Sequence, residues 1–269
     1  MSINRRDMLR FTFGAAALSA VSGIQIPAFA REFPCPVGVQ MFGVRKDFNA
    51  DPAGTMAKLA EAGFECVEYA GYPVSIKELA NIQKDTGLKC EGSHLSRPEI
   101  CDPEKFKQTV ENHLELGAKF MICSWQQNET IEDWANAGRM FSEAAEAAKQ
   151  YGLGVGYHAH GHDFDVRENG LTNWEIFADN SSKDVIMQMD TANCPLDCLK
   201  FIAKYPGRSR SVHLKEKGGI IGKGSIDWKK VLELCETVGG VETYIIEHEP
   251  DGDGALRENI ECLKALRNM

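Results

Sequence analysis

The sequence predicts an α/β protein whose leading architecture is a single-domain (β/α)8 barrel, the TIM barrel. Eight short apolar runs alternate with helical stretches, and the unit recurs about every 25 to 35 residues. Such alternation indicates a parallel sheet, and eight units in roughly 250 residues are typical of a closed barrel. A doubly wound open sheet is the alternative, but no Gly-x-Gly-x-x-Gly run follows the first strand. No internal domain boundary or linker is indicated.

The first 30 residues are expected to be a signal peptide and not part of the barrel. Arg5 and Arg6 belong to a run that resembles a twin-arginine export motif, and an apolar stretch follows over residues 11–26. Ala-Phe-Ala at positions 28–30 is a small-x-small cleavage site. A membrane anchor is less favoured, because Gly and Ser interrupt the short apolar stretch. We therefore expect residues 31–269 to form a mature, periplasmic barrel.

The net charge limits the classes of binding partner, and the cysteine pattern bears on disulfide bonds. The leader holds three Arg and one Asp, so the mature chain has 27 basic and 38 acidic residues, a formal charge of −11. This charge disfavours nucleic acid and, after signal cleavage, anionic membranes. The nine cysteines are odd in number and irregularly spaced, which favours small buried residues over a disulfide framework. Cys194 and Cys198 are spaced compatibly with a bridge or a metal pair.

The first four strand–helix units are predicted from apolar runs and from helix-capping residues. Pro103 lies in the first turn of one helix and Gly117 follows its end, and Gly87 and Gly152 follow the ends of two others. The expected elements, in order, are strand 37–42, helix 55–62, strand 64–69, helix 75–86, strand 88–94, helix 103–116, strand 119–123 and helix 131–150.

The last four units follow the same alternation. The fifth strand leads into three histidines at 158, 160 and 162, and Pro206-Gly207 closes a later helix. The expected elements after this strand are helix 174–178, strand 185–189, helix 197–204, strand 210–214, a helix from 225 or 227 to 237, strand 243–248 and helix 256–266.

Ionisable residues stand at the ends of these last four strands: His158 with His160, then Asp190, His213 and Glu247. Because side chains alternate along a strand, their apolar neighbours should face the helices and the ionisable residues the barrel interior. They would meet at the C-terminal mouth, where barrel enzymes keep their chemistry. Buried unpaired charges are costly, and a divalent cation would offset that cost.

Each of these residues has another interpretation when taken alone. Asp190 is compatible with a helix N-cap, a single histidine with a hydrogen-bonded core residue, and Glu247 with an ion pair to Lys215. The occurrence of all of them at ends of different strands favours the metal site.

Short motifs then connect the chain to a known family. They are Val37-Gly38-Val39-Gln40, Gly63-Phe64-Glu65-Cys66-Val67-Glu68, Tyr157-His158-Ala159-His160, Asp190-Thr191-Ala192-Asn193, His213-Leu214-Lys215, Gly222-Lys223-Gly224-Ser225-Ile226-Asp227-Trp228 and Ile246-Glu247-His248-Glu249. In this order they resemble the xylose isomerase-like TIM-barrel superfamily, the sugar phosphate isomerase/epimerase group, over nearly all of the mature chain.

The resemblance implies a divalent metal held by Glu, Asp, His and Glu from four successive strands. Asp190, His213 and Glu247 match the last three positions, and His158 stands where many relatives have Glu. A subgroup with a Tyr-His-Asn-His run shares this change, and His160 is the alternative ligand. Carboxylates with imidazoles suit Mn, Co or Zn better than Mg or Ca.

The chemistry implied by the resemblance is formation of an enediolate from a hydroxy-carbonyl sugar. Reprotonation gives isomerisation or epimerisation, and loss of a β-substituent gives elimination. Glu247 and His158 or His160 are the acid/base candidates, and Lys215 would donate to an enediolate oxygen. The expected substrate contacts are Glu68, His94, His160 and Asn193, and Trp125 is either a sugar-facing ring or core.

Three functional classes remain. The first is an isomerase or epimerase of a small carbohydrate, with a lyase or hydratase on a keto-sugar or keto-glycoside as a close variant. A nuclease of the endonuclease IV type is disfavoured by the net charge, and a catalytically silent sugar-binding barrel is the third class. We find no cluster of Arg dedicated to a phosphate. A homo-oligomer is compatible with the sequence.

Overall fold

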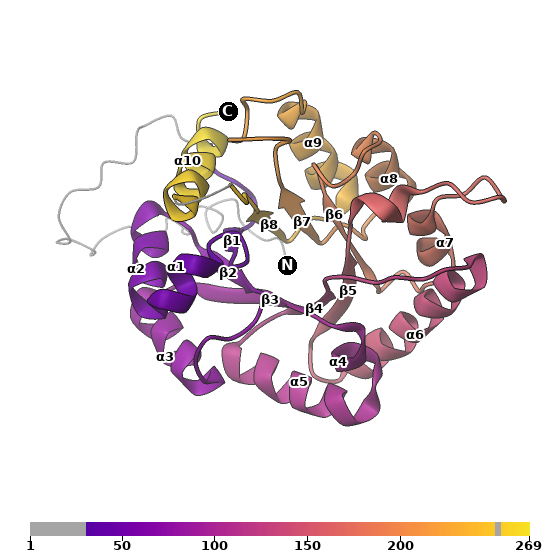
Figure 1. The fold of residues 1–269 in the computed structure, drawn as a ribbon, viewed down its shortest axis with the longest axis horizontal. Coiled ribbons are helices and arrows are strands. Elements are labelled where there is room, and N and C mark those ends of the chain that lie inside the picture. Colours follow the sequence, from indigo (N-terminus) through magenta and orange to yellow (C-terminus); the bar gives the residue numbers. More distant parts are fainter. Residues whose placement is uncertain (1–30, 251–253) are drawn as a thin grey trace, which may run out of the picture. The chain divides into compact units, whose positions relative to one another are not determined.

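The computed structural model describes residues 31–250 and 254–269, so the predicted signal peptide lies outside the described residues. Eight parallel strands form a closed barrel in sequence order, and β1 pairs with β8 to complete the ring. Figure 1 shows the strands at the centre with the helices around them, which confirms the (β/α)8 barrel. The strands are β1 (Val37–Gln40), β2 (Cys66–Tyr69), β3 (Lys89–Leu95), β4 (Phe120–Cys123), β5 (Gly154–His158), β6 (Ile186–Asp190), β7 (Ser211–Leu214) and β8 (Thr243–Ile246).

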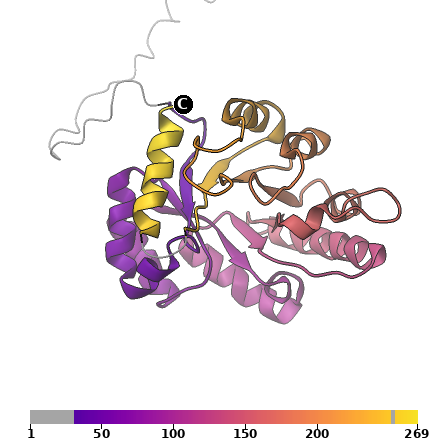
Figure 2. The ribbon, with the colours of Figure 1, turned by 45° about the horizontal axis from the view of Figure 1, so that its top comes forward.

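The helices alternate with the strands along the chain. Each predicted helix is found within a few residues of its expected bounds. After α10 the chain ends beside the first units, where α10 contacts α2 (Figure 2). The helices are α1 (Arg45–Ala50), α2 (Pro52–Ala62), α3 (Ile76–Thr86), α4 (Arg97–Cys101), α5 (Pro103–Leu116), α6 (Ile131–Lys149), α7 (Asn173–Asp179), α8 (Cys198–Lys204), α9 (Trp228–Leu234) and α10 (Ala255–Arg267), with a 3-10 turn η1 (Gly161–Phe164) and a π-helical turn η2 (Cys235–Gly239).

Capping residues explain where the helices begin and end. The Ser75 side chain accepts a hydrogen bond from the backbone N–H of Glu78 and so caps α3. Gly87 and Gly117 follow α3 and α5 with φ of 78° and 64°, the left-handed conformation that glycine adopts without strain. These short-range signals account for the agreement with the sequence prediction.

The lower half of the barrel interior is filled by an apolar floor made of Phe120, Ile122 and Ile186, all buried. Glycines leave room for it: a Cβ at Gly156 would lie 2.7 Å from Cβ of Ile186 and 2.8 Å from Cδ1 of Ile122. A larger, separate core packs the outer face of the strands against the helices. The ionisable side chains His158, Asp190, His213 and Glu247, by contrast, lie at or near the C-terminal ends of the strands.

A β-bulge in β3 interrupts the strict alternation of side chains. Val67 of β2 pairs with Cys90, but the next residue, Glu68, pairs with Gly92, so Glu91 is an extra residue in β3. Cys90 belongs to the outer core, whereas Gly92 and His94 face the barrel interior beside Glu68. Under strict alternation, Cys90 and His94 would face the same side because they are an even number of residues apart. The extra residue Glu91 changes this, so His94 faces the barrel interior.

Cysteines and membrane segments give two further results. All nine cysteines fall within the described residues and are free thiols, so Cys194 and Cys198 form no disulfide. Among the described helices, none combines the length and the apolar character needed to cross a membrane.

Candidate metal centre

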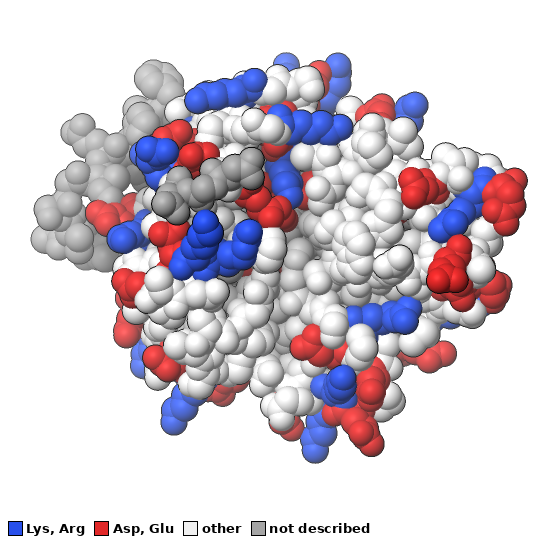
Figure 3. Space-filling view, in the orientation of Figure 1, with Lys and Arg blue, Asp and Glu red and all other residues white. Residues whose placement is uncertain are grey.

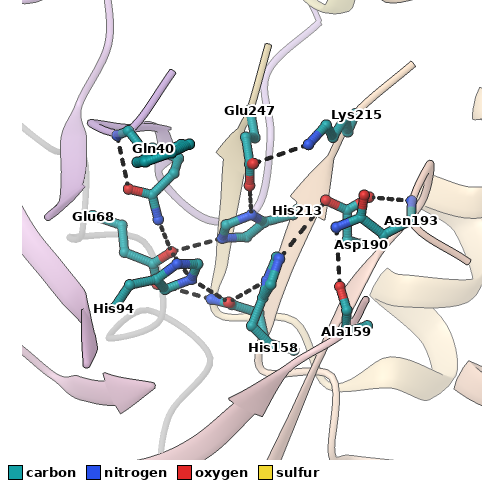
Figure 4. Close-up of polar contacts among 12 residues, drawn as sticks. Gln40, Glu68, His94, His158, Ala159, Asp190, Asn193, His213, Lys215 and Glu247 are labelled. Atoms are coloured by element: carbon teal, nitrogen blue, oxygen red, sulfur yellow. Dashed lines mark hydrogen bonds and ion pairs between the residues drawn. The ribbon is translucent and has the colours of Figure 1, made fainter. Parts of the chain in front are cut away.

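Four strand ends bring His158, Asp190, His213 and Glu247 together at the C-terminal mouth of the barrel (Figure 4). One ligand atom from each lies within 4.8 Å of those of the other three, and all four residues are buried. The predicted direction of these side chains, into the barrel, agrees with this geometry. The arrangement results from the parallel sheet, because the C-terminal ends of all strands meet at one rim.

Asp190 is the residue whose environment best fits a cation ligand. Its Oδ1 atom accepts hydrogen bonds from the backbone N–H groups of Ala192 and Asn193, at 2.8 and 2.7 Å. Its Oδ2 atom is buried without any hydrogen-bond partner in the structure. Such an atom carries a large desolvation cost, and burial with the charge of Glu247 raises the pKa of Asp190 to about 6. A cation at Oδ2 would remove that cost.

The two candidate ligand histidines, His158 and His213, are held by contacts to neighbouring polar groups. His158 Nδ1 lies 2.9 Å from Oε1 of Gln188, so its Nε2 is left to face Asp190 Oδ2, 3.9 Å away. Burial, together with His213 and His94, holds the pKa of His158 well below its usual value. His158 is therefore a neutral imidazole, the form that binds metals.

His213 lies between two carboxylates. Its Nε2 is 2.6 Å from Oε2 of Glu68 and its Nδ1 is 2.5 Å from Oε2 of Glu247. Burial alone would lower its pKa, but the two carboxylates raise the pKa of His213 to about 10. A ligating histidine whose other nitrogen donates to a carboxylate is the usual arrangement in protein metal sites, and Glu68 supplies that carboxylate.

Glu68, which the sequence analysis expected to contact the substrate, does not line the pocket. It is 1% exposed and lies beneath the site, where its carboxylate accepts only from protein groups. Burial would raise the pKa of Glu68, but the charges of His94 and His213 hold it well below the usual value. The four donors to its two oxygens are Gln40 Nε2 at 2.7 Å, Gln188 Nε2 at 2.8 Å, His213 Nε2 at 2.6 Å and His94 Nε2 at 3.0 Å.

The contacts of Glu68 with Gln40, His94, Gln188 and His213 form an inner network. This inner network also decides between two candidate metal positions. His94, His158 and His213 form a second group of imidazoles within 4.8 Å. Their inner nitrogens, however, already contact Glu68 or Gln188: His94 Nε2, for example, lies 3.0 Å from both Glu68 Oε2 and Gln188 Oε1. The group that contains Asp190 retains a buried ligand atom without a partner, so it is the better candidate.

Lys215 contacts two carboxylates at the rim of the site. Its Nζ lies 3.0 Å from Oε1 of Glu247 and 2.6 Å from Oε1 of Glu249. Burial alone would lower its pKa, but Glu247, Asp190 and Glu249 raise it above the usual value. The ion-pair interpretation of Glu247 is thus correct in part, because the same carboxylate contacts Lys215 through Oε1 and His213 through Oε2.

A pocket of about 460 Å³ opens above these residues. Three of the expected substrate contacts, His94, His160 and Asn193, line it, and Glu68 does not. Trp125 is 51% exposed on the pocket wall, so it is not core, and its ring lies 4.7 Å from that of His160. Burial lowers the pKa of His160 to about 4, so this imidazole is also neutral. The lining residues are Gln40, Phe42, Ala70, His94, Ser124, Trp125, His158, His160, Asn193, Lys215, Glu247 and Glu249.

Three residues that shape the site were not predicted. Glu249 lines the pocket, and the alternation Glu-His-Glu after β8 would have indicated it, since Glu247 and Glu249 are two apart. Gln188 accepts from both His94 and His158, a role for which the sequence carries no local signal. Asp163 accepts from the backbone N–H of His160 at 2.6 Å and from the Tyr157 hydroxyl at 2.7 Å, which fixes the turn that carries His160.

Comparison with known proteins gives consistent results. The family described as Xylose isomerase-like TIM barrel matches residues 56–266. An inosose dehydratase of Geobacillus thermodenitrificans (strain NG80-2) is 24% identical over 248 residues, 73% of this chain and 81% of that protein. A sugar phosphate isomerase/epimerase structure from Parabacteroides distasonis ATCC 8503 has TM-score 0.80 and 21% identity, covering 90% of this chain and 98% of that one. The structure of IOLI protein with a binding zinc atom has TM-score 0.66 and 14% identity, covering 86% and 95%.

Proposed function

The chain belongs to the xylose isomerase-like TIM barrel family, and we propose that it is a metal-dependent isomerase or epimerase of a sugar or sugar derivative. The observation that carries the proposal is the buried, unpartnered Oδ2 atom of Asp190 beside His158, His213 and Glu247, directly under a pocket. Similarity to an inosose dehydratase and to a sugar phosphate isomerase/epimerase supports a carbohydrate substrate.

The four converging residues would hold the metal. Two carboxylates balance the charge of a divalent ion, and two imidazole nitrogens favour Mn, Co or Zn over Mg or Ca. When bound, the metal would polarise the substrate's hydroxy-carbonyl group and acidify the adjacent C–H.

The protein's own groups would then move the proton. Glu247 lines the pocket; burial would raise its pKa, but the hydrogen bond to His213 and its charge hold the pKa well below the usual value, so the carboxylate is available as a base. It would take the proton from the carbon next to the carbonyl, leaving an enediolate. Lys215 Nζ, 3.0 Å from Glu247, would donate a hydrogen bond to the enediolate oxygen. His158 or His160, both neutral and both lining the pocket, would exchange the proton on the other side.

A lyase or dehydratase is the second candidate, and a specific feature favours it. With a carboxylate on one side of the pocket and imidazoles on the other, the acid and the base differ chemically. A carboxylate that removes a proton and a chemically different group that protonates a departing hydroxyl would suit elimination of water from the same enediolate. The similarity to an inosose dehydratase supports this alternative.

We further propose that the protein is exported by the twin-arginine route and acts in the periplasm. This proposal depends on the Arg5–Arg6 pair and the cleavage site at 28–30 in the sequence.

The test is exchange of substrate C–H hydrogen with deuterated water, followed by NMR on Mn²⁺-loaded protein with ketopentoses, ketohexoses and inososes. Exchange reports the enediolate whether the product is an isomer or an alkene. Glu247→Gln should reduce the exchange rate by roughly 10²–10⁴-fold while the protein stays folded. Glu242→Gln, which changes an exposed glutamate paired with Arg210 just before β8, is the matched control. Sugar binding without exchange in the wild type would favour the silent binding barrel instead.

A further inference from the structure

We propose that Glu249 makes this pocket selective for uncharged hydroxy-carbonyl sugars. It does so by pairing with the ammonium group of Lys215, which would otherwise bind a phosphate or carboxylate group of a substrate. This inference rests on the proposed function of the same site. It concerns Lys215, Glu249 and Arg45, and it assigns a specificity role to Glu249.

Lys215 is the cation that an anionic substrate would need. Among the described residues that line the pocket, it is the only lysine or arginine. Its ammonium group lies 2.6 Å from Glu249 and 3.0 Å from Glu247, so two carboxylates share one positive charge. A phosphate that approached Lys215 would meet both carboxylates, and like charges a few ångström apart in a partly desolvated pocket repel strongly.

Arg45 does not supply a second anion-binding group. Its Nη1 donates to the backbone oxygen of Phe42 at 2.7 Å and lies 3.8 Å from Oε2 of Glu249. Its guanidinium also stacks on the Phe42 ring, with 4.0 Å from Cζ to the ring centroid. Glu249 thus has a cation on each side, and each of the two cations already has partners inside the protein.

Acidic residues accompany the basic ones near the pocket. On the face drawn in Figure 3, lysines and arginines of the described residues lie among acidic residues. The acidic groups at the site are Asp190, Glu247 and Glu249, with Glu68 beneath them. Lys215 and Arg45 therefore each lie beside at least one of these carboxylates.

The remaining lining suits a neutral polyol. Ser124, His160 and Asn193 offer uncharged hydrogen-bonding groups, and Phe42 and Trp125 are 42% and 51% exposed. Such apolar faces pack against the C–H faces of a sugar ring without a charge requirement. The chemical class that fits is therefore a free ketose, inosose or neutral glycoside and not a sugar phosphate.

The experiment compares binding of neutral and phosphorylated sugars to the Mn²⁺-loaded protein by calorimetry at fixed ionic strength. The probes are D-fructose with D-fructose 6-phosphate and D-ribulose with D-ribulose 5-phosphate. The wild type should bind each neutral sugar at least about 10-fold more tightly than its phosphate. Glu249→Gln should raise phosphate affinity by roughly 10-fold, the effect of removing one nearby like charge, and change neutral-sugar affinity little.

Two further variants make the outcome decisive. Adding Lys215→Gln to Glu249→Gln should abolish the gain in phosphate affinity, because the gain depends on the released ammonium group. Glu242→Gln should leave both affinities unchanged. Tighter binding of the phosphorylated sugar by the wild type, or an equal change for both sugars in Glu249→Gln, would overturn the inference while the proposed function stands. A metal-loaded wild type that binds neither sugar and exchanges no C–H hydrogen would overturn both.

Discussion

The substitution Glu68→Gln tests the inner network most directly. It preserves the size and shape of the side chain but removes its charge and replaces one acceptor oxygen by an NH2 donor. All four groups that contact the Glu68 carboxylate are N–H donors, so the new NH2 group must face at least one of them. Gln188 cannot turn its amide over to compensate, because its Oε1 already accepts from His94 and His158.

The main consequence is expected at His213. Without the carboxylate 2.6 Å from Nε2, the ring loses the contact that orients Nδ1 toward Glu247 and the site. Hydrogen bonds to charged groups contribute about 1.5–3 kcal/mol, which corresponds to roughly 10–150-fold in an equilibrium constant. Loss of a carboxylate behind a metal-binding histidine typically costs about 10–100-fold in metal affinity. We therefore expect Zn²⁺ and Mn²⁺ affinity to fall by one to two orders of magnitude.

The assay is metal titration against a competing chelating dye, with circular dichroism to confirm folding. Glu175→Gln is the control, because Glu175 also accepts several bonds, from Thr172 and from Lys204 at 2.7 Å, but lies on α7 outside the barrel. The control should lose some stability and keep its metal affinity. A folded Glu68→Gln protein with wild-type metal affinity would refute the positioning role.

Three further expectations follow from the same structure. Asp190→Ala and His213→Ala should each lose bound metal in elemental analysis of purified protein, and unchanged content in both would remove the metal site. Burial lowers the pKa of His113 below its usual 6.5, so the unfolded chain binds a proton that the folded chain excludes. Stability should therefore decrease as pH falls through about 6.5, and His113→Gln should flatten this dependence in thermal melts; equal slopes would contradict it. N-terminal sequencing of the envelope fraction should begin at or near Arg31, and an uncleaved cytoplasmic chain would contradict export.

The regular elements of the barrel were predictable because their signals are local. Apolar runs gave the strands, and glycines such as Gly87 and Gly117 marked helix ends. The short elements α1, α4 and η1 were missed because four to six residues are too few to show a helical period. Each of them follows the C-terminal end of a strand, where the loops form the pocket.

The candidate ligands were predictable because they occupy equivalent strand ends, but their partners were not. Glu68 looked like a rim residue, yet it contacts His213, which is 145 residues away in the sequence. Such a contact is decided by barrel closure and by the bulge in β3, neither of which leaves a local pattern. Glu249 lies two residues beyond Glu247, and both residues line the pocket.

The bulge at Glu91 also bears on how such a barrel can change during evolution. Everything beyond it in β3 is turned over relative to strict alternation, so Gly92 and His94 line the interior and Ser93 faces Tyr72 on the outside. Regular pairing of Glu91 with Glu68, without the bulge, would exchange the two faces, presenting Ser93 to the site and His94 to the helices. Deletion of Glu91 would instead leave Cys90 next to Gly92 and keep both faces as they are. A change of one residue in register could thus replace a whole wall of the site, whereas a change in length that a bulge absorbs would not. Insertions and deletions inside the strands deserve the same attention as substitutions when active sites of such barrels are compared.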